Sequence, residues 1–331
     1  MKPTATILAA AIASILCGTA WAEPQKIRLA SPAPGPAAIN GFFARWAEDV
    51  TAASDATLTV EFVPGGVLGR EGQLLDRVAA GLIEMAWDFQ GYYPGKYPRS
   101  AVAEQPFQFE TAEQGSVALQ RVYEAGLLAG EYDDVKVVGL FTFPNASLML
   151  KERLDDLAGL KGRKITAQNP TMQAAAEHLG GVALNLPIPD WYPSLDRGVI
   201  DGAIVTFTAV PAFRLNEVMT EFIDIRLGGN PGMFVMNRGA YDALPEKARA
   251  ALDAHAGEMF ARGMGKFLEK LNEKSKGLAA QGNNRVVTLD DATATEWQEK
   301  VAPLTEAWLA RDPSHAAIRD AFLKEAGRDS D

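Results

Sequence analysis

The residue types that most often perform chemistry are few and scattered in this chain. The three histidines, His178, His255 and His315, have no second ligand residue at a spacing that would hold a metal ion. There is no G-x-S-x-G nucleophile motif and no glycine-rich phosphate loop, and the only cysteine is Cys17. We therefore expect neither a metal nor a cofactor. These absences argue only weakly against an enzyme, because catalytic carboxylate pairs have no characteristic spacing.

Aromatic side chains gather where predicted strands end. They are Trp87, Phe89, Tyr92 and Tyr93 in one stretch, and Trp191, Tyr192 and Phe207 in another. Any one of them could be a core residue. As a group on loops that follow strands they favour a ligand cleft, since α/β sheets bind ligands at the carboxyl ends of their strands.

Two carboxylates lie within these aromatic stretches. Asp88 interrupts an apolar strand end beside Trp87, and Asp190 precedes Trp191. A buried carboxylate needs a partner, and with no arginine nearby in the sequence a cationic ligand could supply it. Aromatic rings attract cations as well. The alternative is that Asp88 binds backbone amides or a lysine and that Asp190 only caps its helix.

The elements that position these residues follow a strand–helix–strand pattern. Within residues 160–207, the β-branched run Lys164–Ala167 leads into an Ala-rich helix that stops at Gly180-Gly181, and a later strand starts at Gly202. Residues 26–89 show the same alternation of strand and helix. The sequence therefore predicts an α/β protein with largely parallel strands.

A chain of 331 residues, 47% of them hydrophobic, is long enough for two cores. We expect the chain to cross to a second lobe near residues 147–150 and to return near 233–238. The first lobe would hold residues 23–146 and 233–270, and the second lobe residues 147–232 and 271–331. Apolar residues recur at helical spacing from Pro245 to Gly277, which predicts one helix of roughly 30 residues, about 45 Å long, spanning both lobes.

Residues 1–22 have the features of a secretory signal peptide. Lys2, an apolar run and the small-residue pattern that ends at Ala22 predict cleavage before Glu23 and export to the periplasm. The formal charge of the whole chain is −10, which argues against nucleic acid as a partner. Cys17 lies in the cleaved segment, so the mature chain would contain no thiol.

Three segments resemble one protein family. They are MAWDFQGYYPGKYP, the unit LKGRKI followed by NPTMQAAAEHLGG, and above all PIPDWYPSLDRGVIDGA. All three closely resemble the DctP-type extracytoplasmic solute receptors of TRAP transporters, and the similarity spans essentially the whole mature chain. The last segment matches the family's proline-rich turn, acidic residue, aromatic residue, Leu-x-Arg-Gly and Asp-Gly, here at Asp190, Tyr192, Leu195–Gly198 and Asp201-Gly202.

The resemblance implies an α/β, two-lobed periplasmic binding protein fold with a hinge and a long helix across both lobes. A small-molecule solute would be enclosed between the lobes and delivered to the small and large integral membrane subunits of a sodium-driven transporter. We expect the receptor to be a monomer or a weak dimer. Two alternatives stay open: a periplasmic hydrolase or lyase on a similar frame, and a receptor that serves a membrane sensor kinase.

One position departs from the family pattern. Members usually carry an arginine directly after the Lys-Ile of the central strand, where its guanidinium forks onto a ligand carboxylate, but here Thr166 follows Lys164-Ile165. Arg163 faces the opposite way along the strand and is a poor substitute. We therefore expect a cationic or hydroxylated solute, such as the amino alcohol ethanolamine, and an organic acid held by other donors is the alternative. The expected ligand contacts are Trp87, Asp88, Tyr92, Tyr93, Asn145, Thr166, Gln168, Asp190, Trp191, Tyr192 and Phe207.

Overall fold

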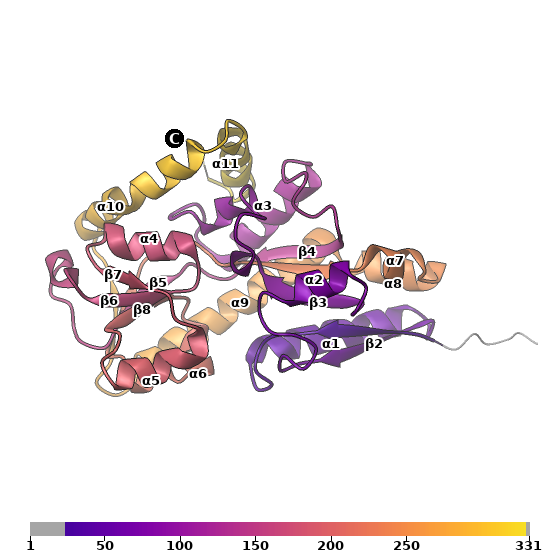
Figure 1. The fold of residues 1–331 in the computed structure, drawn as a ribbon, viewed down its shortest axis with the longest axis horizontal. Coiled ribbons are helices and arrows are strands. Elements are labelled where there is room, and N and C mark those ends of the chain that lie inside the picture. Colours follow the sequence, from indigo (N-terminus) through magenta and orange to yellow (C-terminus); the bar gives the residue numbers. More distant parts are fainter. Residues whose placement is uncertain (1–23, 329–331) are drawn as a thin grey trace, which may run out of the picture.

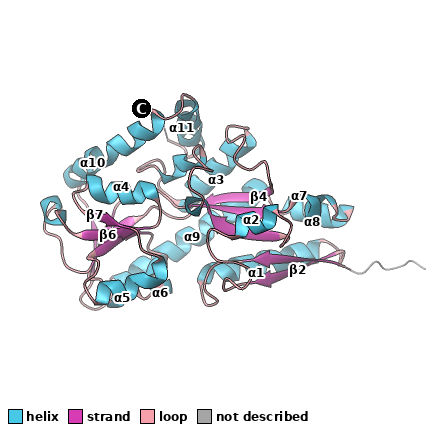
Figure 2. Ribbon diagram, in the orientation of Figure 1, coloured by secondary structure: helices cyan, strands magenta, loops and turns pink. Residues whose placement is uncertain are grey.

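Two β-sheets organise the chain, which the computed structural model describes from residue 24 to residue 328 (Figure 1). Each sheet, with the helices that pack against it, forms one lobe. One long helix, α9, contacts both lobes (Figure 2). This arrangement confirms the two-lobed α/β architecture expected from the sequence. The signal peptide predicted for residues 1–22 lies outside the described residues.

The first sheet has the strand order β2-β1-β3-β10-β4. Its strands are β1 (Gln25–Ala30), β2 (Leu58–Val63), β3 (Met85–Phe89), β4 (Lys136–Thr142) and β10 (Pro231–Met236). β1 is parallel to β2 and β3, whereas β10 runs antiparallel between β3 and β4. Every residue of β3 is buried, because hydrophobic cores lie on both faces of this sheet.

The second sheet has the strand order β11-β9-β5-β8-β6-β7. Its strands are β5 (Ser147–Leu150), β6 (Lys164–Ala167), β7 (Val182–Leu184), β8 (Gly202–Val205), β9 (Glu221–Asp224) and β11 (Arg285–Thr288). β6 is parallel to β7 and β8, while β5 is antiparallel to β8 and β9. The chain passes from the first sheet to the second through residues 143–146 and returns through residues 225–230.

Eleven α-helices connect the strands in the described part of the chain. They are α1 (Ala38–Ala53), α2 (Leu74–Ala79), α3 (Ala112–Glu124), α4 (Pro170–His178), α5 (Trp191–Asp196), α6 (Ala209–Ala212), α7 (Arg238–Asp242), α8 (Glu246–Ala254), α9 (Gly257–Ala279), α10 (Asp291–Leu309) and α11 (Ser314–Glu325). Local signals set some of their starts: the Asn169 side chain accepts a hydrogen bond from the Met172 amide at 2.8 Å, and Pro170 occupies the first turn of α4. Among residues 24–328, no helix has the length and apolar character needed to cross a membrane.

The single helix of roughly 30 residues predicted between Pro245 and Gly277 is wrong, because the chain breaks it into α8 and α9. Gly257 adopts a φ of +61°, in the left-handed region that glycine tolerates, and the backbone of Ala256 is extended. The 23 residues of α9 still reach about 35 Å. α9 packs on α1, α3 and β4 in the first lobe and on α6 and β11 in the second, so the expected contact with both lobes is present.

The C-terminal helices also divide between the lobes. Trp297 and Val301 of α10 pack into a core of the second sheet, whereas Trp308, Ile318 and Phe322 pack into a core of the first. α11 lies on α3 of the first lobe. This packing differs from the division drawn from the sequence, which placed the whole segment 271–331 with the second lobe.

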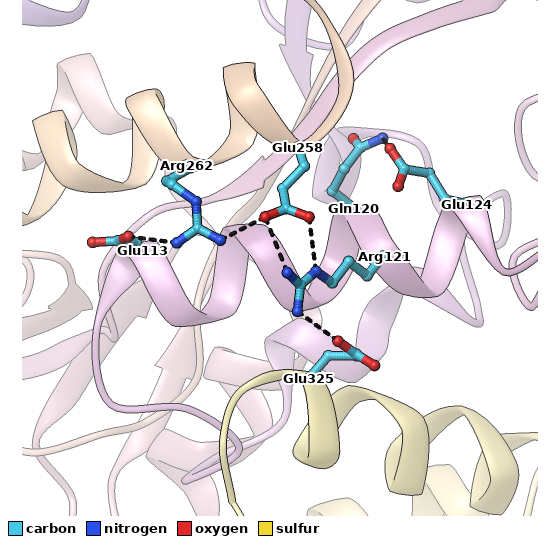
Figure 3. Close-up of polar contacts among 7 residues, drawn as sticks. All are labelled: Glu113, Gln120, Arg121, Glu124, Glu258, Arg262 and Glu325. Atoms are coloured by element: carbon cyan, nitrogen blue, oxygen red, sulfur yellow. Dashed lines mark hydrogen bonds and ion pairs between the residues drawn. The ribbon is translucent and has the colours of Figure 1, made fainter.

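An ion-pair network ties α3, α9 and α11 together (Figure 3). Arg121 of α3 donates to Glu258 of α9 and to Glu325 of α11, in each case at 2.8 Å. Arg262, one turn along α9, donates to Glu258 and to Glu113 of α3. The hydrogen bonds from Arg121 and Arg262 lower the pKa of Glu258 to about 2. The network holds the long helix and the C-terminal helix on the first lobe.

Candidate ligand-binding site

A cavity of about 260 Å³ lies between the two lobes, with α9 along one side. This volume is slightly below the roughly 300–1,000 Å³ that small-molecule pockets occupy, so it suits a small ligand. Residues from the first lobe include Pro34, Ile39, Glu71, Trp87 and Phe89, and Phe143 comes from the crossing segment. The second lobe contributes Gln168, Ile188, Thr206, Thr208 and Phe213, and α9 contributes Leu271, Lys274, Ser275 and Leu278.

The first lobe presents an aromatic wall formed by three side chains. Trp87 and Phe89 lie on the same face of β3 because strand side chains alternate, and their ring centres are 5.2 Å apart. Phe143 lies 5.1 Å from Phe89, between centroids. The Trp87 indole is held in place by a 2.8 Å hydrogen bond from its ring nitrogen to the Ser31 hydroxyl and by stacking on Phe43 at 5.5 Å. The wall is therefore preorganised to receive an apolar or aromatic group.

Polar groups are few and lie mostly on the opposite side. Just after β8, the hydroxyls of Thr206 and Thr208 are 2.5 Å apart. Gln168 follows β6, and its buried side-chain oxygen has no hydrogen-bond partner among the described residues. Lys274, on α9, is exposed and is the only cation in the described lining. These groups can hold one small polar or charged head of a ligand.

Glu71 is the only acidic side chain among the described residues of this lining. Burial, followed by the negative charge of nearby Asp88, raises its pKa to about 7, and the Tyr92 hydroxyl partly offsets this. Near neutral pH this carboxyl is therefore divided between its neutral and charged forms. It can act as a hydrogen-bond donor or as a negative charge, depending on its protonation.

Asp88 does not face the cavity, which corrects its expected role as a ligand partner. Its carboxylate is fully buried and accepts hydrogen bonds from the amides of Gly72 at 3.0 Å, Leu74 at 3.2 Å and Phe89 at 2.8 Å. The Tyr93 hydroxyl donates to it at 2.6 Å, so Tyr93 is also directed away from the ligand. Burial raises the pKa of Asp88 to about 6, although these hydrogen bonds oppose the shift. Asp88 thus holds the loop before α2, the alternative role considered from the sequence.

The aromatic residues of the family signature lie away from the cavity as well. Trp191 and Phe207 are fully buried in a core of the second lobe. The Tyr192 hydroxyl donates to Glu217 at 3.1 Å near the surface. Asp190 is exposed at the start of α5 and makes no side-chain cap hydrogen bond. None of these four residues lines the cavity, so their expected contacts with a ligand gain no support, and the family signature forms part of the second lobe.

Three further expected contacts also lie outside the cavity lining. Thr166 is fully buried on β6, two residues before Gln168, with its hydroxyl unpartnered among the described residues. The side-chain amide of Asn145 donates to the Phe109 carbonyl at 3.0 Å, within the crossing between the lobes. Tyr92 packs between the two cores of the first sheet, next to Glu71. Of the expected contacts, only Trp87 and Gln168 line the cavity.

Several lining residues were missed by the sequence interpretation. Thr206 and Thr208 directly follow β8, so the rule that ligands lie at strand ends could have found them. Phe89 belonged to the aromatic group that favoured a cleft but not to the expected ligand contacts, although it shares its strand face with Trp87. No sequence pattern around Glu71 marks it as a cavity residue. Its position depends on a loop whose amides, at Gly72 and Leu74, donate to Asp88 of a distant strand.

Family comparison agrees with this architecture. Residues 33–312 match the model of the DctP family, bacterial extracellular solute-binding protein family 7. The chain belongs to this family. It is a solute-binding receptor of the TRAP type, as the resemblance of its signature segments implied.

In the described residues, no group of three or more His, Cys, Asp or Glu side chains is placed to hold a metal ion.

Relatives of this DctP-family receptor cover most of its length. The outer membrane transporter protein TsaT of Comamonas testosteroni is 29% identical over 279 residues, covering 82% of this chain and 81% of TsaT. The C4-dicarboxylate-binding periplasmic protein DctP of Rhodobacter capsulatus is 23% identical, covering 92% and 89%.

Among solved structures, a marine metagenome TRAP solute-binding protein specific for aromatic acid ligands superposes with a TM-score of 0.86 and 26% identity. The alignment covers 92% of this chain and 99% of that protein, which is bound to 3-hydroxybenzoate. A TRAP solute-binding protein from Rhodoferax ferrireducens T118, in complex with benzoate, superposes with a TM-score of 0.85 at 22% identity, covering 92% and 98%. The latter likeness establishes the fold only.

Proposed function

We propose that this TRAP receptor binds an aromatic monocarboxylate and carries it through the periplasm to the small and large membrane subunits of its transporter. The observation that carries the proposal is the aromatic wall of Trp87, Phe89 and Phe143, which lines the same cavity as Leu271 and Leu278 of α9. An aromatic ring buries its faces well in such a site. The relative specific for aromatic acid ligands supports the same class.

The ligand carboxylate would be held without an arginine. Among the described residues that line the cavity none is an arginine, and Arg163 is occupied by the carbonyls of Gly159, Glu152 and Arg153, each at 2.9 Å. Donors in the lining include Lys274, the two threonine hydroxyls and the side-chain amide of Gln168. This corresponds to the alternative considered from the sequence, an organic acid held by other donors.

The amino alcohol expected from Thr166 and Asp88 is not supported by this lining. Ethanolamine has little apolar surface to place against three aromatic rings, and its hydroxyl and ammonium groups would need several polar partners. Asp88, which was expected to supply the counter-charge, is already saturated by backbone amides and Tyr93.

A thermal-shift screen followed by calorimetry tests the ligand class. Benzoate and 3-hydroxybenzoate should stabilise the receptor, whereas ethanolamine and succinate should not. Phe143→Leu should weaken benzoate binding about five- to tenfold, because an aromatic pair contributes about 1 kcal/mol beyond its buried area. Phe62→Leu, at a half-buried position outside the cavity, is the matched control. Stabilisation by ethanolamine alone would overturn the proposal.

Export, assembly and the lack of turnover belong to the same proposal. Amino-terminal sequencing of the exported protein should begin at Glu23, and light scattering should give a monomer or a weak dimer. Mass spectrometry after prolonged incubation should recover the bound acid unchanged. A converted product would favour the hydrolase or lyase alternative.

A further inference from the structure

Glu71 places an acidic group against the site where an anionic ligand would bind. We propose that the receptor takes up one proton on Glu71 when it binds an aromatic carboxylate, so that a neutral carboxylic acid, and not a second anion, faces the ligand. The proton comes from the solvent and converts the Glu71 carboxylate to its acid form. The inference rests on the proposed function and names how that site accommodates the charge of its ligand.

The position of Glu71 is constrained by the backbone that follows it. Asp88 accepts hydrogen bonds from the amides of Gly72 and Leu74, so the loop that carries Glu71 is fixed to β3. Gly72 has a φ of +77° and packs against Tyr92, whose Cβ would lie 3.1 Å from an added side chain. The backbone on either side of this loop is therefore held in place, which keeps Glu71 in the cavity lining that also includes Trp87.

The groups around Glu71 do not neutralise its charge. Asp88 of β3 is negative when ionised, and Tyr92, the nearest hydroxyl, is neutral at physiological pH. No lysine or arginine in residues 24–328 contributes to the titration of Glu71. Lys274 is the only cation in the described lining, and it is exposed on α9. One lysine cannot compensate Glu71 and a ligand carboxylate together.

Electrostatics then favour proton uptake on binding. The pKa of Glu71 in the unliganded cavity is already raised to about 7, first by burial and then by Asp88. A bound aromatic carboxylate adds a negative charge and removes water, and both effects disfavour the charged form of Glu71 further. The neutral acid can also donate a hydrogen bond to the ligand. Binding is therefore expected to be linked to protonation of this one carboxyl.

Calorimetry with 3-hydroxybenzoate measures this linkage directly. The ligand carboxylate is ionised throughout the range from pH 6 to pH 8, so a change in affinity reports on the protein. The dissociation constant should rise about tenfold from pH 6 to pH 8, as expected for a group that titrates near 7 before binding. Titrations in two buffers of different ionisation enthalpy should show uptake of nearly one proton at pH 8 and almost none at pH 6.

The variant Glu71→Gln should remove both effects, leaving an affinity that does not change over this pH range. Glu61→Gln, at an exposed carboxylate on β2, is the matched control and should behave as the wild type. Proton uptake that persists in Glu71→Gln would overturn the assignment and point to Asp88. An affinity that falls with acidification, as for a cationic ligand paired with ionised Glu71, would overturn it as well.

A ligand-free measurement separates this inference from the proposed function. Failure of 3-hydroxybenzoate to bind would count against the ligand class, and the protonation of Glu71 can then be read from unfolding. Because the pKa of the folded state is raised above its unfolded value, the stabilising effect of the proton is complete below about pH 4.5 and is lost as pH rises through 7. Wild-type protein should therefore lose stability relative to Glu71→Gln between pH 5 and pH 8. A difference that is independent of pH would overturn the proposal.

Discussion

Two glycines in α9 make a matched test of how closely this helix packs on α3. At Gly265 an added Cβ would lie 2.5 Å from the Cα of Glu113 and 2.8 Å from the carbonyl oxygen of Ala112. Both contacts are with backbone, which cannot rotate away as a side chain can. At Gly277, twelve residues further along the same helix, an added Cβ would meet nothing within 4 Å.

The two substitutions to alanine should have opposite signs. Each gains about 1 kcal/mol of helix propensity, because glycine is that much less favourable than alanine inside a helix. Gly277→Ala should therefore raise the free energy of unfolding by about 1 kcal/mol and the Tm by about 2 °C. At Gly265 the clash forces α9 and α3 apart, and overpacking of this kind costs about 1–3 kcal/mol or more. Because both contacts are with backbone, we expect a cost in the upper part of this range, so Gly265→Ala should lower stability by up to about 2 kcal/mol after the propensity gain.

Thermal and urea unfolding of the two variants beside the wild type measures both effects. The comparison does not depend on the absolute stability of the receptor, since the propensity gain is common to the two sites. If Gly265→Ala raised the Tm as much as Gly277→Ala, the close approach of α9 to α3 would be refuted. A loss in both variants would instead show that glycine is needed for the flexibility of α9 itself.

Three further predictions follow from the polar interior. Asp88→Asn should destabilise the receptor by about 2–4 kcal/mol in urea unfolding, because an amide cannot accept from three backbone amides and Tyr93 as a carboxylate does; an unchanged midpoint would refute this. Glu104 is buried at the junction of the lobes and its pKa is raised to about 7, so Glu104→Gln should flatten the loss of Tm that the wild type shows between pH 5 and pH 8; parallel profiles would contradict it. The lowered pKa of Glu258 stabilises the folded state above about pH 4.5 and loses this effect as pH falls toward 2, so Arg121→Met should reduce acid resistance, by no more than about 1 kcal/mol at these partly exposed side chains; equal acid midpoints would argue against a contribution from the network.

Much of the secondary structure could be predicted because its signals are local. The run Lys164–Ala167 is β6 as expected. Asn169 and Pro170 mark the start of α4 through contacts with residues of the same turn. The family signature in residues 187–203 is also local, since it forms one short helix and the turn that leads into β8.

The break between α8 and α9 could not be predicted from the apolar pattern. The helical spacing of apolar residues continues through Gly257, because apolar residues of α8 and of α9 are buried in the same core of the first lobe. The pattern reports which residues face the core and does not report the backbone angle of a glycine. The extended backbone of Ala256 and the φ of +61° at Gly257 end the continuity.

Neighbouring residues were thus sufficient for the family, the two lobes and most strand positions, because caps, alternation and turn motifs act over a few residues. The identity of the ligand-facing side chains was decided by the tertiary structure. Trp87 and Trp191 have similar local sequences, each next to an aspartate, and both are buried in cores, yet only Trp87 also lines the cavity. Helices cover the sheets of both lobes, so apolar surfaces are available to aromatic residues in either lobe. Which of these surfaces borders the cavity depends on how the two lobes and α9 come together.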